Sequence, residues 1–218
     1  MKEFAKQYLA ILTGRLAGLN LTRIESEEDF YMKQIVDSVL PLEQSDVFVE
    51  ALQRTGVHVD VGFGGGFPLL PIAKAVPELK SVGFEARGKK AKAVQSIADE
   101  LGLTNVKALH QRVENVYFDC DAVVTLKAVG KVEDFLPLLI SDKNLYVFFY
   151  KGPNFYELEN LEKIMRYWEL IEEKYYDLPG TEGRMLVGFK NRNVLRGTLI
   201  KRLQKNKQKD LVKLTDLL

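Results

Sequence analysis

The sequence predicts an α/β fold: a mostly parallel seven-stranded sheet, with an antiparallel hairpin at its edge and helices before its first strand. From Val57 onward, short apolar runs alternate with amphipathic stretches, as expected of strands that helices cover on both faces. The first run leads through a glycine-rich turn, Gly62-Phe63-Gly64-Gly65-Gly66, into a helix. The last two runs are joined by a short turn that contains Pro179 and Gly180, which favours an antiparallel pair.

The N-terminal part of the chain is predicted to be helical and to form a lid on the strands that follow. Apolar side chains in residues 1–19 repeat at the spacing of one helix face, and Asn20-Leu21-Thr22 interrupts them. Ser26, which is followed by three acidic residues, predicts the start of a second helix that ends near Pro41. A third, shorter helix is predicted over Asp46–Arg54.

The middle of the chain is predicted to supply the parallel strands and the helices that connect them. The predicted strands are Val57–Val61, Ser81–Glu85, Val106–His110, Ala122–Leu126 and Leu145–Tyr150. The predicted helices are Pro68–Ala75, Lys89–Leu101, Val132–Leu139 and Tyr156–Tyr167. Two further strands, Leu170–Leu178 and Arg184–Lys190, complete the sheet as its hairpin.

Composition favours one large domain, or one domain with appendages, in a reducing compartment. The chain has 218 residues, of which 46% are hydrophobic, so it can bury a full core. Its one cysteine, Cys120, excludes an internal disulfide framework. The sequence has no apolar run near the roughly 18 residues of a membrane span, and its first residues do not resemble a signal peptide. We therefore expect a cytoplasmic protein with no membrane partner.

Charge is distributed unevenly along the chain. Residues 190–218 carry nine Lys or Arg against two Asp, a net charge of +7, whereas the rest of the chain has a net charge of −6. A basic segment behind an acidic body suggests a polyanionic partner, most simply nucleic acid, although a solvated terminal helix explains it equally well. The predicted organisation is a helical lid over residues 1–54, a core over 55–190 and a basic C-terminal tail or helix over 191–218.

The glycine-rich turn predicts a nucleotide-type cofactor. Glycine allows a ligand to approach the main chain, and the helix that follows offers its N-terminus to the ligand. A phosphate-binding loop would need Gly-Lys-Ser/Thr at its end, and a dinucleotide fingerprint would need one more residue before Gly66. The pattern Asp60-x-Gly62-x-Gly64-x-Gly66 instead suits S-adenosylmethionine, which has no phosphate. A tight turn without a ligand remains the alternative.

Two carboxylates flank this turn. Glu85 ends the second predicted strand, where it can accept hydrogen bonds from both ribose hydroxyls of the cofactor. A surface ion pair with Arg87 or Lys89 is the alternative. Asp60 lies in an apolar strand, where burial of a carboxylate is costly unless it meets hydrogen-bond donors or a cation. The loop N–H groups or a cofactor ammonium would serve, and a simple cap of the turn is the alternative. We expect no metal.

Several segments resemble the bacterial 16S rRNA guanine-N7 methyltransferases, historically called the glucose-inhibited division protein B family. The most specific is the run from Asp60 to Pro68. The resemblance covers about residues 15–190 and departs from the family's pattern at Gln34, where the family has histidine, and at Lys127, where it has arginine. The other agreeing segments, in order, are Asn20-Leu21-Thr22, Lys33–Val39, Gln111–Glu114 and Thr125–Val129.

The resemblance implies a divergent member of this family with a class I, Rossmann-like methyltransferase fold. It implies S-adenosylmethionine as methyl donor and N7 of a guanine in small-subunit rRNA, free or in an assembling 30S subunit, as acceptor. By position, Gly62 and Phe67 border the cofactor, Val113-Glu114 contact its adenine, and Lys127 lies near its methionine and the acceptor base. Together with the residues of the turn, the predicted cofactor-binding set is Asp60, Gly62, Gly64, Gly66, Phe67, Glu85, Val113, Glu114 and Lys127.

Methylation of guanine N7 requires no general base. Guanine N7 carries an exposed lone pair, so catalysis can come from holding N7 in line with the methyl group. Lys127 is the predicted catalytic residue, whereas His58 and His110 are expected to be structural. We expect a monomer. A methyltransferase of the same fold that acts on another RNA or a small molecule, and a non-catalytic RNA- or ribosome-binding protein, remain alternatives.

Overall fold

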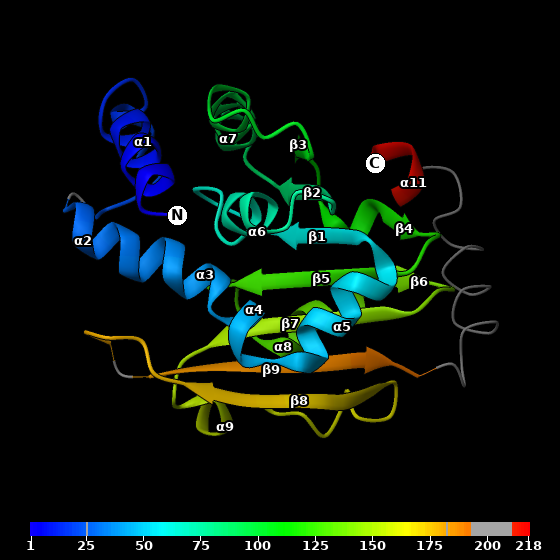
Figure 1. Cartoon of the computed structure of the whole chain (residues 1–218). Coiled ribbons are helices and arrows are strands. Elements are labelled where there is room, and N and C mark those ends of the chain that lie inside the picture. The colour runs from blue at the N-terminus through cyan, green and yellow to red at the C-terminus, as the bar shows by residue number, and fades with distance from the viewer. Residues whose placement is uncertain (25, 182, 193–210) are drawn as a thin grey trace.

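A computed structural model describes residues 1–24, 26–181, 183–192 and 211–218, and a seven-stranded sheet forms its centre (Figure 1). The predicted α/β fold is confirmed. The strands are β1 (Val57–Val61), β2 (Lys80–Glu85), β3 (Val106–His110), β5 (Ala122–Lys127), β7 (Leu145–Lys151), β8 (Trp168–Tyr176) and β9 (Arg184–Asn191).

The strand order is β3-β2-β1-β5-β7-β9-β8. The first five strands in this order are parallel, and β9 is antiparallel to both of its neighbours, so the predicted edge hairpin is present. The last strand of the hairpin is inserted between β7 and β8. Because parallel strands share one carboxyl edge, Gly62 after β1, Glu85 at the end of β2 and Lys127 at the end of β5 all come to that edge.

The helices before β1 are present but shorter than the sequence indicates. Ser26 Oγ accepts a hydrogen bond from the Asp29 N–H at 3.1 Å, which confirms the predicted start of the second helix. A π-helical turn, Tyr31–Val36, continues that helix. The elements are α1 (Lys2–Thr13), a 3-10 turn (Ala17–Leu19), α2 (Glu27–Phe30), α3 (Asp37–Val39), α4 (Pro41–Gln44) and α5 (Asp46–Thr55).

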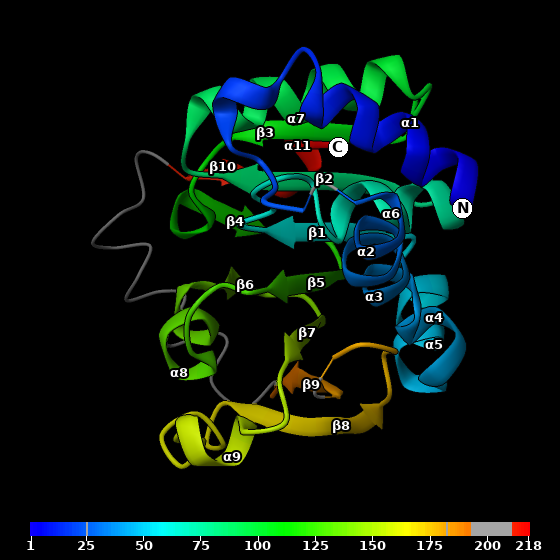
Figure 2. The same cartoon turned by 90° about the vertical axis from the view of Figure 1, so that its left-hand side faces the viewer.

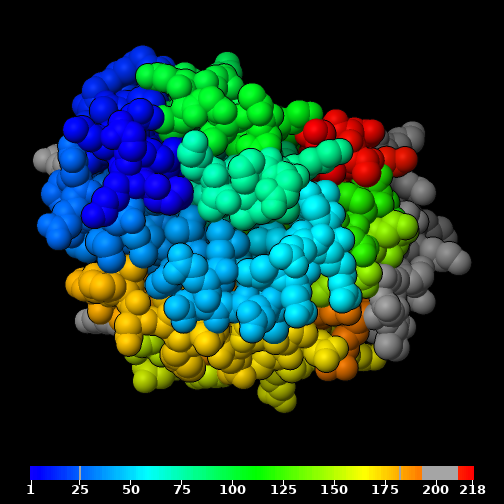
Figure 3. Space-filling model, in the orientation of Figure 1, coloured from blue at the N-terminus to red at the C-terminus, as the bar shows by residue number. Residues whose placement is uncertain are grey.

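After β1, the α-helices of the described residues are α6 (Leu69–Ala75), α7 (Gly88–Glu100), α8 (Val132–Phe135), α9 (Phe155–Leu158) and α11 (Leu214–Leu217). One face of the sheet packs against α1, α5, α6 and α7, and the other against α8, α9 and α11. Successive side chains of β7 point to opposite faces of the sheet: Phe148 packs with α5, and Phe149 packs on the face that α8 covers. Figure 2 shows α5 and α6 on the opposite side of the strands from α8 and α9, and Figure 3 shows the N-terminal helices and α5 spread over one face.

Two predicted helices are wrong in extent. The helix predicted over Tyr156–Tyr167 ends as α9 at Leu158, because the side chain of Glu159 turns inward and binds Lys151 Nζ at 2.5 Å and the Val132 N–H at 2.8 Å. The helix predicted over Val132–Leu139 stops at Phe135 and continues as a 3-10 turn, Leu136–Leu138. Pro137 lies in that turn and lacks the N–H that an α-helix needs.

The C-terminal residues return to the core. A second, parallel three-stranded sheet, which the sequence does not predict, consists of β10 (Val212–Lys213), β4 (Val116–Phe118) and β6 (Ile140–Ser141). After β10, Leu214 is fully buried and Thr215 binds the Asp119 carboxylate through its N–H and its hydroxyl, at 3.0 and 2.7 Å. Most of the basic tail, residues 193–210, lies outside the described part of the chain. In the described ranges, no helix has the length and apolar character needed to cross a membrane.

Candidate active site

A cavity of about 700 Å³ opens at the carboxyl edge of the parallel strands. Its walls come from the N-terminal segment, the glycine turn after β1, the ends of β5 and β7 and the start of β9. Of the predicted site residues, Gly62, Gly64, Phe67 and Lys127 line it. Asp60, Gly66, Glu85, Val113 and Glu114 do not contribute to its lining.

The glycines of the turn serve packing against neighbouring elements as well as access of a ligand to the main chain. Gly62, Gly64 and Gly66 all have positive φ angles, +74°, +56° and +98°, which other residues rarely adopt. A Cβ on Gly66 would lie 2.2 Å from the hydroxyl oxygen of Tyr8, and that hydroxyl donates a hydrogen bond to the carbonyl oxygen of Gly65. Gly66 is therefore required by α1, which packs onto the turn, rather than by a surface of the cavity.

Glu85 ties the turn to the end of β2. Its carboxylate accepts hydrogen bonds from the Gly64 N–H at 3.1 Å and from the Arg87 N–H at 2.9 Å. The side chains of Arg87 and Lys89 make no ion pair with it among the described residues, unlike the alternative that the sequence left open. A carboxylate has about four acceptor positions, so two remain for hydroxyl donors beside the turn.

Asp60 caps α6 beneath the cavity. It is fully buried, and its carboxylate accepts hydrogen bonds from the Leu69 N–H at 3.0 Å and the Thr125 hydroxyl at 2.9 Å. The same hydroxyl lies 2.8 Å from Nε2 of His58, which is also fully buried. Burial raises the pKa of Asp60 to about 7 and lowers the pKa of His58 to about 3. The geometry matches the cap that the sequence left open as an alternative for Asp60.

The pH dependence of stability should reveal this buried carboxyl. Folding raises the pKa of Asp60 from 3.8 to about 7, so between these pH values the folded state binds more protons than the unfolded chain. Its contribution to stability is full below about pH 4 and is lost as the pH rises through about 7. We therefore expect Asp60→Asn, which has no proton to lose, to gain stability relative to the parent as the pH rises from about 4 to about 7. Urea unfolding measures the difference, and a constant difference would contradict this assignment.

Val113 and Glu114 lie beyond Glu85, on the far side from the cavity lining. They belong to a 3-10 turn, Val113–Asn115, that follows β3. The Gln111 N–H donates to the Glu85 carbonyl oxygen at 3.2 Å, which places this turn beside the end of β2. Val113 is buried in the core, whereas Glu114 is partly exposed. Their predicted contact with adenine stays a prediction.

Lys127 is held in a group of charged side chains at the opposite wall. Its Nζ lies 3.0 Å from Asp37 Oδ2 and 6.0 Å from the centre of the Phe67 ring. The second oxygen of Asp37, Oδ1, lies 3.4 Å from Arg184 Nε. The Asp37 side chain is only 3% exposed. One buried carboxylate thus connects α3, the end of β5 and the start of β9.

Sequence reasoning did not single out Asp37 or Arg184 as site residues. Asp37 lies within the segment Lys33–Val39, whose resemblance to the family was the signal that could have identified it. Arg184 opens β9 and carries no local signal, since only the antiparallel insertion of β9 beside β7 brings it to this edge.

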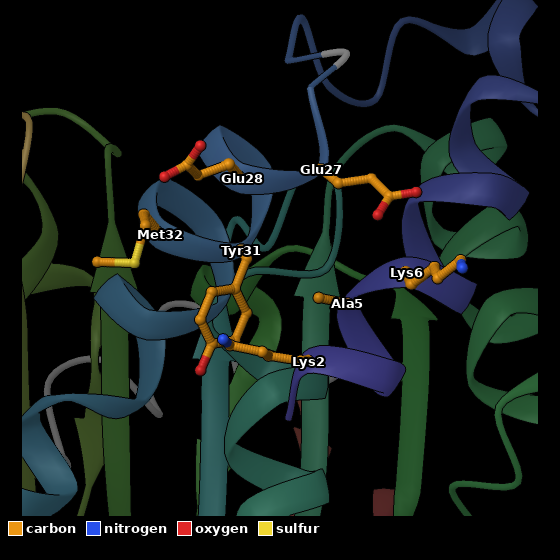
Figure 4. A pocket seen from close by; sticks show the side chains of 7 residues that line it. All are labelled: Lys2, Ala5, Lys6, Glu27, Glu28, Tyr31 and Met32. Atoms are coloured by element: carbon orange, nitrogen blue, oxygen red, sulfur yellow. The ribbon is translucent and has the colours of Figure 1, made fainter.

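A second cavity, of about 410 Å³, lies between α1 and α2 (Figure 4). Lys2 and Lys6 line it from α1, Glu27 and Glu28 line it from α2, and Lys2 Nζ lies 5.9 Å from the centre of the Tyr31 ring. None of its lining residues belongs to the first cavity. We therefore assign the site to the first cavity alone.

The glycine turn, the strand-end carboxylate and the cavity at the carboxyl edge of the parallel strands are typical of α/β proteins that bind a nucleotide-type cofactor. Solved methyltransferase structures share this fold. The mitomycin 7-O-methyltransferase MmcR superposes with a TM-score of 0.55 at 13% identity, covering 85% of this chain and 60% of that chain. The StiE O-MT structure, residues 961–1257, gives 0.54 at 14% identity, covering 94% and 90%. The fold is thus that of the class I methyltransferases.

The chain belongs to the GidB family, described as rRNA small subunit methyltransferase G, whose model matches residues 1–184. It is 34% identical to the ribosomal RNA small subunit methyltransferase G of Lactobacillus helveticus, over 85% of this chain and 81% of that protein. It is 36% identical to the protein of the same name from Lactobacillus delbrueckii subsp. bulgaricus, over 78% and 74%. The predicted family is confirmed.

Proposed function

We propose that this protein transfers the methyl group of S-adenosylmethionine to N7 of a guanine in small-subunit rRNA. The observation that carries this function is the cavity at the carboxyl edge, with the glycine turn on one wall and Lys127 on the other. Membership of the rRNA small subunit methyltransferase G family supports both the donor and the class of acceptor.

The residues of the turn hold the donor side. When bound, S-adenosylmethionine supplies a methyl group on a positively charged sulfur. Gly62 and Gly64 present bare backbone to it, and the free acceptor positions of Glu85 bind the ribose hydroxyls. Phe67 packs beneath α1 and α2 through the rings of Tyr8 and Phe30, which keeps this wall rigid.

The opposite wall receives the acceptor. Guanine N7 has a free lone pair at neutral pH, so no side chain has to remove a proton, and alignment with the methyl group supplies the rate enhancement. Lys127, held by Asp37, supplies positive charge at this wall. Its attachment to a buried carboxylate limits its motion, which suits a positioning role.

The partner is small-subunit rRNA, free or in an assembling 30S subunit, and we place the reaction in the cytoplasm with the protein as a monomer. Lysines of the cavity rim and the basic segment after β9 favour a polyanion. Large apolar side chains that are exposed on the described surface are scattered over several elements, which favours a monomer.

Mass spectrometry of nucleosides and primer-based mapping of small-subunit rRNA test this function. We expect one N7-methylguanine to be lost when the gene is deleted and to return with the parent protein. Purified protein and S-adenosylmethionine should restore it on rRNA or 30S subunits from the deletion strain. An unchanged modification profile would overturn the assignment.

A further inference from the structure

We propose that Arg184, held in place by Asp37, donates a hydrogen bond to O6 of the acceptor guanine and so selects guanine over adenine. This inference rests on the proposed function and names the residue that reads the base. Arg184 is then a specificity-determining residue, and Asp37 is its positioning residue. The basis is the number of unused hydrogen-bond donors on the cationic side chains that line the cavity.

Lys127 has few donors left for a substrate. An ammonium group has three N–H donors. Three acceptors surround Lys127 Nζ: Asp37 Oδ2 at 3.0 Å, Gln34 Oε1 at 3.5 Å and the Lys33 carbonyl oxygen at 3.5 Å. Its charge acts on the cavity, but its N–H groups point to partners within the protein.

The other two lysines of the cavity are also engaged. Lys151 Nζ lies 2.5 Å from Glu159 Oε1 and donates to the Gly130 carbonyl oxygen at 2.8 Å. Lys33 Nζ pairs with Asp29 at 2.8 Å, and its side chain is 37% exposed, on the outer rim. Neither lysine combines burial with a set of free donors.

Arg184 has the donors that the lysines lack. A guanidinium has five N–H donors in a rigid plane. The described contacts use Nε, 3.4 Å from Asp37 Oδ1, and Nη1, which donates to the Gly183 carbonyl oxygen at 3.0 Å. Among the described residues, one N–H on Nη1 and both N–H groups on Nη2 have no acceptor. The side chain lines the cavity and is 28% exposed, so a ligand can reach it.

Asp37 is built to hold this arginine. Its Oδ1 is buried and accepts no hydrogen bond of ordinary geometry within the described part of the chain, so its interaction with Arg184 is an ion pair. Tyr176 lies close by, and burial together with the negative charge of Asp37 raises the pKa of its hydroxyl above the ordinary value. The two oxygens of Asp37 hold Lys127 and Arg184 apart at fixed positions.

The chemistry of the base decides what such a donor recognises. Guanine presents the acceptor O6 beside N7, whereas adenine presents an amino donor at the same position. A guanidinium carries donors only, so it binds O6 and opposes the adenine amino group. A hydrogen bond to O6 leaves the lone pair of N7 free for the methyl group.

The test compares three RNA substrates at the mapped target nucleotide: guanine, hypoxanthine, which keeps O6 but lacks the 2-amino group, and 2-aminopurine, which lacks O6 but keeps N7. The parent protein should lose about 10- to 100-fold in kcat/KM on 2-aminopurine RNA, as expected for a hydrogen bond to a charged group, and little on hypoxanthine RNA. Arg184→Met should lose about as much on guanine RNA and nothing further on 2-aminopurine RNA. Its affinity for S-adenosylhomocysteine should stay unchanged.

Arg166→Met is the matched control, because Arg166 is exposed and outside the cavity lining; it should retain the parent's preference. If Arg184→Met and the 2-aminopurine substitution each lowered kcat/KM independently, so that the two losses multiplied, the assignment would be overturned. Arg184 would then contact an RNA phosphate or serve the stability of the fold. A parent protein that methylates guanine and 2-aminopurine RNA equally well would also overturn it. Failure of the proposed function is distinguishable, because then the parent would methylate no rRNA at all.

Discussion

Glu85→Gln is expected to weaken binding of S-adenosylmethionine by about 10- to 100-fold, the effect of losing a hydrogen bond to a charged acceptor. Both oxygens of Glu85 already accept a backbone N–H, from Gly64 and from Arg87. Glutamine replaces one oxygen with an NH₂ group, which opposes one of these donors and cannot accept from a ribose hydroxyl. Isothermal titration calorimetry with S-adenosylmethionine and its demethylated product measures the loss.

The control for this variant is Glu100→Gln. Glu100 pairs with Arg15 at 2.7 Å on the exposed side of α7, so its replacement should leave cofactor affinity unchanged. Circular dichroism should show that both variants are folded. Full affinity in folded Glu85→Gln would show that the donor does not use this carboxylate.

Asp37→Asn is expected to lower the free energy of unfolding by about 3 kcal/mol, because two cations lose the buried charge that compensates them. Asp37 is 3% exposed and its partners Lys127 and Arg184 are both partly buried. The amide also turns a donor toward one of the two cations. We expect kcat/KM on rRNA to fall by at least about 10-fold, since Arg184 loses the group that positions it. Urea unfolding and methyl-transfer kinetics measure the two effects.

Asp29→Asn is the matched comparison. Asp29 pairs with Lys33, another lysine of the cavity, on the same N-terminal segment, but its side chain is 52% exposed. Water screens such a pair, so the loss of stability should be less than about 0.5 kcal/mol. Asp37→Glu, which keeps the charge, should recover part of the activity. Equal costs for Asp29→Asn and Asp37→Asn would contradict the central role of the buried carboxylate.

Local pattern predicted the sheet closely. The five parallel strands and both strands of the hairpin begin and end within about two residues of the predicted positions, because short β-branched and aromatic runs bounded by turns have few other solutions. Helix ends were less predictable where a side chain binds residues far away in the sequence. Glu159 ends α9 early by binding Lys151 and the Val132 N–H, contacts that no local propensity encodes.

The residues of the candidate site also differ in how far the sequence predicts their roles. Gly62, Gly64 and Glu85 are recognisable from spacing, since a glycine turn after one strand and an acid at the end of the next must meet at a shared edge. Gly66 and Asp60 follow the same pattern but serve packing against α1 and the cap of α6. Spacing therefore located the turn without separating residues that face the cavity from residues that support it.

The sequence by itself determined the family, the parallel sheet and the glycine turn, because these depend on local periodicity and on contiguous motifs. The tertiary structure decided the charged wall of the cavity, where Asp37, Lys127 and Arg184 come together from α3, β5 and β9. It also decided that the C-terminal residues return to the core, with Leu214 buried beside β4. Contacts between segments far apart in the chain depend on how the whole core packs. Because the Asp37 carboxylate is buried, its position determines where both cations, Lys127 and Arg184, lie.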